Sequence, residues 1–167
     1  MGTGSYWGAQ KLNDLFKQLV KHLLGDQFNA VLERVGGPDA PADLILEPLA
    51  RGFEKAKRGF STASTDDIKI RFDSDQALPK IPGLPLGPKW ITLTAAQMAC
   101  IFDEYIPHVR KLVDDQLQEI RRNSLAKDEA VGVEIVAVGG GSLSPYIIDK
   151  LQEAYPENKV SGQEQTK

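Results

Sequence analysis

The segment VEIVAVGGGSLSPYIIDKL, residues 133–151, constrains the fold of this chain more than any other stretch. Its run of β-branched residues predicts a short buried strand, and the apolar–polar pattern after Pro145 predicts a helix. Ser144 suits the N-cap of that helix, and Pro145 suits its first position. Three consecutive glycines separate strand and helix: Gly139, Gly140 and Gly141. A strand, a glycine loop and a helix N-terminus in this order can bind an anion.

The sequence motifs leave two interpretations of the glycine loop. A Walker A motif requires a lysine after its last glycine, and a dinucleotide fingerprint requires a glycine at the position of Ser144, so neither motif is present. The loop is then either a tight turn between strand and helix or a stretch of bare backbone on which a flat ligand can lie.

The rest of the chain mixes predicted helices with short strands, which is typical of the α/β class. Apolar side chains recur at helical spacing over residues 12–24, and Gly25 is expected to end that helix. Thr94 and Gln97 match a capping box at the start of a long helix that Pro107 is expected to kink or break. The other predicted elements are helices at 27–35 and 43–61, the latter interrupted by Pro48 and Gly52, and strands at 66–73 and 90–94 that form a small antiparallel sheet.

Composition narrows the classes of function. A net charge of −3 and a pI near 5.4 argue against a general nucleic-acid or membrane-surface binder. No apolar run approaches the roughly 20 residues that span a bilayer. The single cysteine, Cys100, excludes a disulfide framework and indicates a reducing compartment, and its helical surroundings predict a small core residue. We therefore expect a cytoplasmic protein without nucleic-acid or membrane partners.

The stretch FEKAKRGFS, residues 53–61, holds the second candidate site. Its polar residues follow the spacing i, i+3, i+4, i+7 and so share one helical face, turned away from the apolar stripe. They are Glu54, Lys57, Arg58 and Ser61. This face is either a solvated surface with a Glu54–Arg58 pair, or a clamp whose carboxylate meets ribose hydroxyls and whose cations stack on a base or meet phosphate.

Four segments then give the chain a family resemblance. In order they read WGAQKLNDLF, FEKAKRGFS, ITLTAAQMACIF and VAVGGGSLSPYI. From about residue 8 to residue 155 the sequence resembles the second half of the nucleotide-binding domain of seventy-kilodalton heat-shock chaperones. It is nearest to their divergent fungal-like and chaperone-like relatives, within the superfamily of actin and the sugar kinases.

The resemblance implies both a fold and a site. Residues 1–132 would form an outer lobe, residues 133–155 a strand, glycine loop and helix of an actin-like ATPase fold, and residues 156–167 a flexible tail. The residues implied to hold the adenosine of ATP or ADP are Glu54, Lys57, Arg58, Ser61, Gly139, Gly140 and Gly141. Leu12 and Asn13 would lie where the family's chain enters the outer lobe.

Two departures from the family pattern shape the functional expectation. Leu143 stands where the family has an arginine that packs on adenine, and Ser144 replaces an isoleucine. The family's phosphate loops, D-x-G-T-[TS] and D-x-G-G-G-T, do not occur in the sequence. We therefore expect a fragment of a chaperone-like ATPase that is inactive alone, with Mg²⁺ and the phosphates held elsewhere in the parent.

The alternative is a regulatory or protein-interaction lobe without nucleotide binding, engaging an exchange factor or co-chaperone through its long helices. A lone piece of a clefted fold would also expose apolar surface. We therefore expect self-association, by an exchange of the C-terminal strand and helix.

Overall fold

The computed structural model describes residues 9–125, 132–139 and 144–162 of the chain. Its elements in chain order are α1 (Ala9–Leu24), a 3₁₀ turn η1 (Gly25–Gln27), α2 (Phe28–Gly36), α3 (Asp43–Ala56), β1 (Ile68–Arg71), β2 (Leu86–Gly87), β3 (Trp90–Leu93), α4 (Ala95–Leu125), β4 (Glu134–Ala137), α5 (Pro145–Ala154) and β5 (Lys159–Gly162). The mixture of helix and strand confirms the α/β class.

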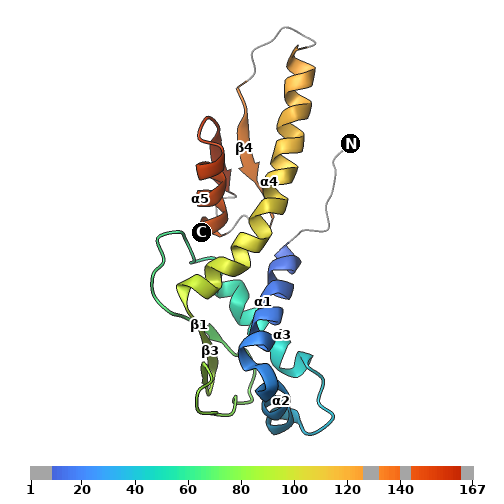
Figure 1. Ribbon diagram of the computed structural model, residues 1–167, viewed down its shortest axis with the longest axis vertical. Coiled ribbons are helices and arrows are strands. Elements are labelled where there is room, and N and C mark those ends of the chain that lie inside the picture. The colour runs from blue at the N-terminus through green and yellow to red at the C-terminus, as the bar shows by residue number, and fades with distance from the viewer. Residues whose placement is uncertain (1–8, 126–131, 140–143, 163–167) are drawn as a thin grey trace.

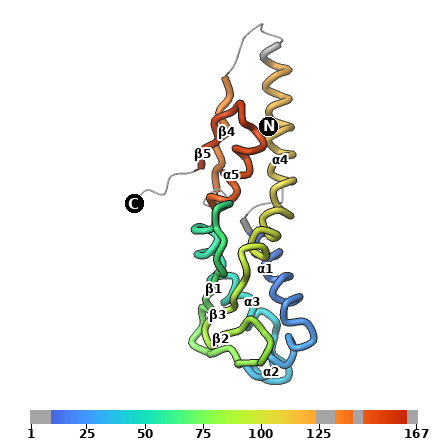
Figure 2. Tube along the Cα trace, turned by 60° about the vertical axis from the view of Figure 1, so that its left-hand side comes forward, coloured from blue at the N-terminus to red at the C-terminus, as the bar shows by residue number. Residues whose placement is uncertain are grey.

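The molecule is elongated (Figure 1). Its lower half contains α1, α2, α3 and the sheet of β1, β2 and β3, and its upper half contains the far end of α4 together with β4, β5 and α5 (Figures 1 and 2). Among the described residues, no helix is long and apolar enough to cross a membrane.

The predicted first helix is confirmed. Helix α1 ends at Leu24, directly before Gly25, and its apolar stripe faces the core. The fully buried side chains of that stripe are Leu12, Leu15, Phe16, Val20 and Leu24. Helix α1 packs against both α3 and α4, so the stripe supplies the centre of the lower half.

Helix α3 differs from its prediction in two ways. It is continuous through Pro48 and Gly52, and it ends at Ala56 rather than near Ser61. The chain turns at this point, where the Lys57 N–H donates to the Phe53 carbonyl and the Gly59 N–H to the Ala56 carbonyl. Because of this turn, Phe60 lies outside the helix and its ring packs against the rings of Phe102 and Tyr146. Tertiary packing therefore ends the helix before its sequence pattern does.

The predicted antiparallel sheet is confirmed, with strand order β1-β3-β2. Ile70 pairs with Ile91, and both are fully buried beneath the helices. Lys89, between β2 and β3, stabilises the long proline-rich connection between β1 and β2. Its ammonium donates to the carbonyls of Ser74, Asp75 and Gln76 at 2.9, 2.9 and 2.8 Å.

Helix α4 begins with the predicted capping box. The Thr94 N–H donates to Gln97 Oε1 at 2.9 Å, and the Gln97 N–H donates to Thr94 Oγ1 at 3.2 Å. The helix is continuous through Pro107, and its lower part runs obliquely to its upper part (Figure 1). The lower part is buried through Met98, Ile101, Phe102, Tyr105 and Ile106. Among the described side chains of α4 that follow Pro107, Leu117 is the one that is buried.

The C-terminal region forms a β–α–β unit in which β4 and β5 are parallel and α5 connects them. The prediction of a flexible tail over residues 156–167 is wrong for residues 159–162, which form β5. The Gln152 side chain holds this strand by accepting from the Val160 N–H at 3.1 Å, and Lys159 pairs with Glu134 at 2.8 Å. The strand forms by pairing with β4, which precedes α5 in the sequence, so local composition does not reveal the strand.

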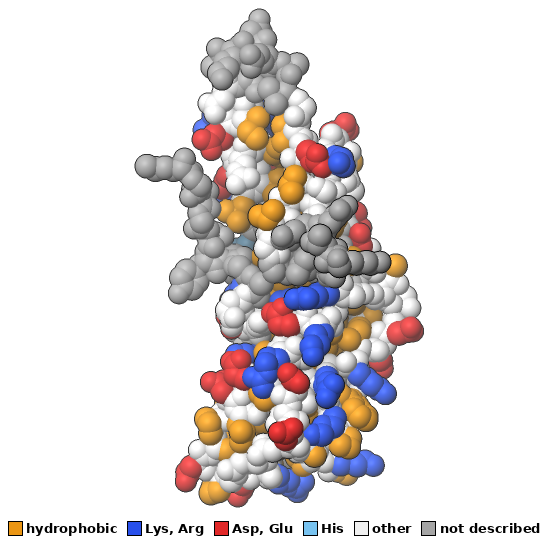
Figure 3. Space-filling model, turned by 180° about the vertical axis from the view of Figure 1, so that it is seen from behind, with side chains coloured by type: hydrophobic (Ala, Val, Ile, Leu, Met, Phe, Trp, Pro, Cys, Tyr) orange, Lys and Arg blue, Asp and Glu red, His pale blue; other side chains and the backbone are white. Residues whose placement is uncertain are grey.

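The prediction for VEIVAV is confirmed as a strand over β4 but is wrong about burial, because none of its described residues is buried. Val136 is 57% exposed, and Val138 directly after β4 is 75% exposed. Seen from behind, Lys and Arg side chains gather on the lower half of the molecule, and hydrophobic side chains are visible on both halves (Figure 3).

Candidate functional site

The centre of the candidate site is a polar network that joins α1 to α3. The Lys57 ammonium donates to Glu54 Oε1 at 2.6 Å and to Asn13 Oδ1 at 3.5 Å. The Asn13 amide donates to the same Glu54 Oε1 at 2.8 Å. Two donors, Asn13 from α1 and Lys57 from the C-terminal end of α3, thus converge on one carboxylate oxygen.

Lys57 lies inside the protein rather than on a solvated face. It is 1% exposed, and its ammonium lies 5.8 Å from the centre of the Phe53 ring. Phe53 in turn stacks on Phe16, with ring centres 4.5 Å apart and planes 1° from parallel. Lys57 keeps helical backbone at the C-cap of α3 and bonds Glu54 one turn before it, but its burial shows that the interpretation as a solvated face is wrong for this residue.

Glu54 is a carboxylate whose charge is stabilised. Partial burial pushes its pKa up, but the hydrogen bonds from Lys57 and Asn13 and the charges of Lys57 and Arg58 outweigh burial and lower the pKa below the ordinary 4.5. The side chain is 35% exposed, and among the described residues no group donates to Oε2. One oxygen is thus held by the protein and the other remains an acceptor.

Arg58 and Ser61 lie on the segment that follows α3. Arg58 is exposed, in keeping with a cation that meets a ligand or solvent. Ser61 is half-buried; its N–H donates to Ser64 Oγ at 3.1 Å, and the two hydroxyls are 3.4 Å apart. Residues 58–61 therefore lie beyond the end of α3 and do not continue its polar helical face.

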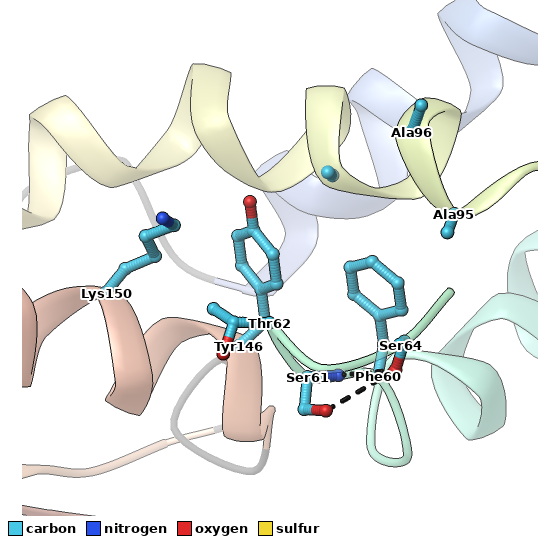
Figure 4. A pocket seen from close by; sticks show the side chains of 9 residues that line it. Phe60, Ser61, Thr62, Ser64, Ala95, Ala96, Tyr146 and Lys150 are labelled. Carbon is cyan, nitrogen blue, oxygen red and sulfur yellow. Dashed lines mark hydrogen bonds between the residues drawn. The ribbon is translucent and has the colours of Figure 1, made fainter. Parts of the chain in front are cut away.

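A hollow of about 250 Å³ opens beside Ser61 (Figure 4). Phe60 and Tyr146 line it with stacked rings 5.1 Å apart, and the first turns of α4 face them. The remaining lining residues are Ser61, Thr62, Ser64, Ala95, Ala96, Ala99 and Lys150. The Lys150 ammonium is paired with Glu153 at 3.0 Å, so the hollow has little free positive charge.

The structure brings the 60–62 segment against α5, the helix that follows the glycine loop. The Tyr146 N–H donates to the Phe60 carbonyl at 3.0 Å. Thr62 donates to Asp149 Oδ2 from both its N–H, at 3.2 Å, and its hydroxyl, at 2.8 Å. The Tyr146 hydroxyl donates to Asp103 at 2.8 Å, which ties the same helix to α4. The two candidate segments of the sequence therefore meet in space.

The N-terminus of α5 does not offer the anion site that its sequence suggests. Pro145 has no N–H, the Tyr146 N–H is taken by Phe60, and the N–H groups of Ile147 and Ile148 point to the Ser144 carbonyl at 3.1 and 3.5 Å. The first-turn donors that an anion would need are used within the protein.

The glycines and Ser144 are placed only in part. Gly139 is exposed with φ of +97°, a conformation that suits glycine, whereas Gly140 and Gly141 lie outside the described residues. Ser144 takes the predicted N-cap position with extended backbone, but its hydroxyl makes no capping bond. That hydroxyl is buried and has no hydrogen-bond partner within the described part of the chain.

The structure gives less support to a role for Cys100 or to metal binding. Cys100 is exposed on α4, so its prediction as a core residue is wrong; the buried positions of this helix turn are Met98, Ile101 and Phe102. Among residues 9–125, 132–139 and 144–162, no group of three His, Cys, Asp or Glu side chains could hold a metal ion.

These features define an α/β protein in which a helical lobe and a parallel β–α–β unit meet at the Phe60–Tyr146 contact. The chain belongs to the family described as Domain of unknown function (DUF8340), whose model matches residues 2–165. No curated protein matches the chain.

Proposed function

We propose that this chain supplies the adenosine side of an ATP- or ADP-binding cleft, as part of the nucleotide-binding domain of a chaperone-like ATPase with an actin-like fold. The observation that carries the proposal is the Glu54 carboxylate. It is held ionised by Lys57 and Asn13, with one oxygen left to accept a hydrogen bond. A ribose presents two adjacent hydroxyl donors to such an acceptor.

The surrounding residues fit a nucleoside in part. Arg58 is exposed and can stack on a base or meet a phosphate, and Ser61 lies beside a hollow with aromatic walls. The volume of about 250 Å³ is just below the roughly 300–1,000 Å³ of ordinary ligand pockets, which suits one side of a cleft. The glycine loop enters α5, and α5 contacts the segment that holds Ser61.

The phosphates would be held outside this site. The first-turn donors of α5 are used internally, and the sequence contains neither family phosphate loop. Phosphoryl transfer depends on positioning and on stabilising charge around the phosphates, with Mg²⁺ in the complete site. We therefore propose that the chain by itself binds nucleoside without hydrolysing ATP.

Isothermal titration calorimetry with adenosine and ADP tests this function. We expect wild type to bind both ligands, and Glu54→Gln to bind them about tenfold more weakly because a charged acceptor is lost. Glu47→Gln is the matched control, since Glu47 lies exposed on the same helix and pairs with Lys17. Equal heats from wild type, Glu54→Gln and an Arg58→Ala, Gly140→Val double variant would end the nucleoside assignment.

A regulatory or protein-interaction lobe is the second candidate. The exposure of Val136 and Val138 and of much of α4 beyond Pro107 favours it, because apolar side chains open to solvent mark interaction surfaces. An exchange factor or co-chaperone is the partner that this function would require. Pull-downs that recover the same partner with and without ADP, and lose it in a Val136→Asp variant, would support this function over the first.

Self-association of the isolated chain is part of the same proposal. Light scattering should show a mass that rises with concentration, and Val138→Asp should reduce the rise. A strict monomer over a wide range of concentration would contradict self-association.

A further inference from the structure

We propose that Lys57 and Asn13 are positioning residues for Glu54: they occupy Oε1 and leave Oε2 as the acceptor that meets a ligand hydroxyl. The inference rests on the proposed function for the identity of the ligand, but the contacts that it uses lie within the protein. It assigns Lys57 a role through Glu54, in place of the direct ligand contact that the sequence resemblance implies.

The position of Lys57 is the first step. Its side chain is 1% exposed, and its ammonium is surrounded by Glu54, Asn13 and the face of Phe53. Burying an ammonium group is costly unless the charge is paired and hydrogen-bonded. The pairing with Glu54 meets that requirement, and it directs the ammonium inward, away from any ligand at the surface.

Asn13 bonds to both Lys57 and Glu54 and so fixes how these two side chains are oriented. Its amide oxygen accepts from Lys57 and its amide nitrogen donates to Glu54, so each end of the amide has a different partner. Asn13 comes from α1, 41 residues before Glu54 in the sequence. The network therefore fixes the Glu54 side chain relative to two helices, and the rotation of its carboxylate is restrained.

The result is a carboxylate with two unlike oxygens. Oε1 accepts from both Lys57 and Asn13, whereas Oε2 has no donor among the described residues. An ionised carboxylate can only accept hydrogen bonds, so it favours a ligand group that donates, such as a hydroxyl, over a carbonyl or a phosphate oxygen. Partial burial raises the pKa of Glu54, but these two partners and the charge of Arg58 lower it below the ordinary 4.5, so the carboxylate stays an acceptor at neutral pH and into mild acid.

Two measurements on the whole chain test the proposal. The first is a carbon-detected NMR titration of the Glu54 carboxyl in wild type, Lys57→Met and Asn13→Leu, with Arg58→Met as the control at an exposed cation. The second is calorimetry with adenosine for wild type, Glu54→Gln, Lys57→Met and the Glu54→Gln, Lys57→Met double variant. If Asn13→Leu does not fold, Asn13→Ala replaces it.

We expect the pKa of Glu54 to rise in Lys57→Met and in the Asn13 variant, and to rise less in Arg58→Met. We also expect Lys57→Met and Glu54→Gln each to weaken adenosine binding about tenfold, with no further loss in the double variant, because both changes act on one acceptor. An unchanged Glu54 pKa in Lys57→Met would overturn the proposal, as would losses that multiply in the double variant, since Lys57 would then contact the ligand itself. If wild type binds no adenosine, the proposed function fails while the titration still decides the positioning role.

Discussion

Gly52 of α3 lies directly against the peptide group of Arg71 in β1. A Cβ atom built at Gly52 would collide with the Arg71 carbonyl oxygen and come within 2.9 Å of its carbonyl carbon. Helix α3 packs against β1, and this glycine lets the helix lie against the backbone of the strand. The helix interior tolerates a weak helix former because a larger residue would push α3 off the strand.

Gly52→Ala is therefore expected to destabilise the protein by about 2 kcal/mol, since overpacking against backbone has no side chain to move aside. Urea denaturation followed by circular dichroism measures the change. Gly59→Ala is the control, because the nearest atom to its added Cβ, the Ala56 carbonyl oxygen, lies at 3.9 Å. A Gly52→Ala variant as stable as Gly59→Ala would show that helix and strand are not in close contact.

Lys89 should stabilise the conformation of the proline-rich connection between β1 and β2. Its three hydrogen bonds end on three successive carbonyls, so Lys89→Met leaves all three without their donor. We expect a loss of about 2 kcal/mol and faster amide hydrogen exchange around residues 73–78. Lys80→Met, at an exposed lysine of the same connection, should change neither quantity. Unaltered exchange in Lys89→Met would contradict a fastening role.

The Glu54 network should make stability depend on acid pH. The pKa of Glu54 is lower in the folded state than its ordinary 4.5, so its stabilising contribution is complete above pH 4.5 and is lost as the pH falls through the lowered value. The difference in unfolding free energy between wild type and Glu54→Gln should thus be constant near neutrality and shrink below pH 4.5. Denaturant curves at several pH values measure it, and a difference that persists in acid would speak against an ionised Glu54.

Tyr155 should make the stability of the fold depend on alkaline pH. Burial and the hydrogen bond to Asp114 raise its pKa from 10.0 to about 12, and its hydroxyl also donates to the Arg110 carbonyl at 3.0 Å. A raised pKa gives a contribution that is full below pH 10 and is lost as the pH rises toward 12. Wild type should therefore lose stability relative to Tyr155→Phe over that range. Phenolate absorbance that titrates Tyr155 near pH 10 would refute this expectation.

Local patterns predict the parts of this fold that depend on local interactions. The stripe from Leu12 to Leu24 and the capping box of Thr94 and Gln97 are confirmed, because helical spacing and capping act within a few residues. The antiparallel pairing of β1 and β3 is confirmed for a similar reason, since the alternation around Ile70 marks which face is buried.

The errors arise where distant partners decide the structure. The Lys57 ammonium is buried where Asn13 of the distant α1 meets Glu54, and α3 ends early where Phe60 packs on Phe102 and Tyr146. Strand β5 exists through its parallel pairing with β4, which its own residues do not reveal. Of the candidate site, sequence alone identified Glu54 and its neighbours, but it could not assign Asn13 to the same network across 41 residues.

The contacts between Thr62 and Asp149 join positions 87 residues apart, and this separation has a consequence for the order of folding. Among the described residues, all but three members of the main buried cluster lie between Leu12 and Ile106; the exceptions, on α5, are Tyr146, Ile147 and Leu151. During synthesis the lower half can therefore assemble before α5 leaves the ribosome, because domains form as their own contacts become complete. Until α5 docks, Phe60 and Phe102 lack the Tyr146 ring that completes their cluster, so the nascent chain carries an aromatic surface that is covered only when α5 arrives.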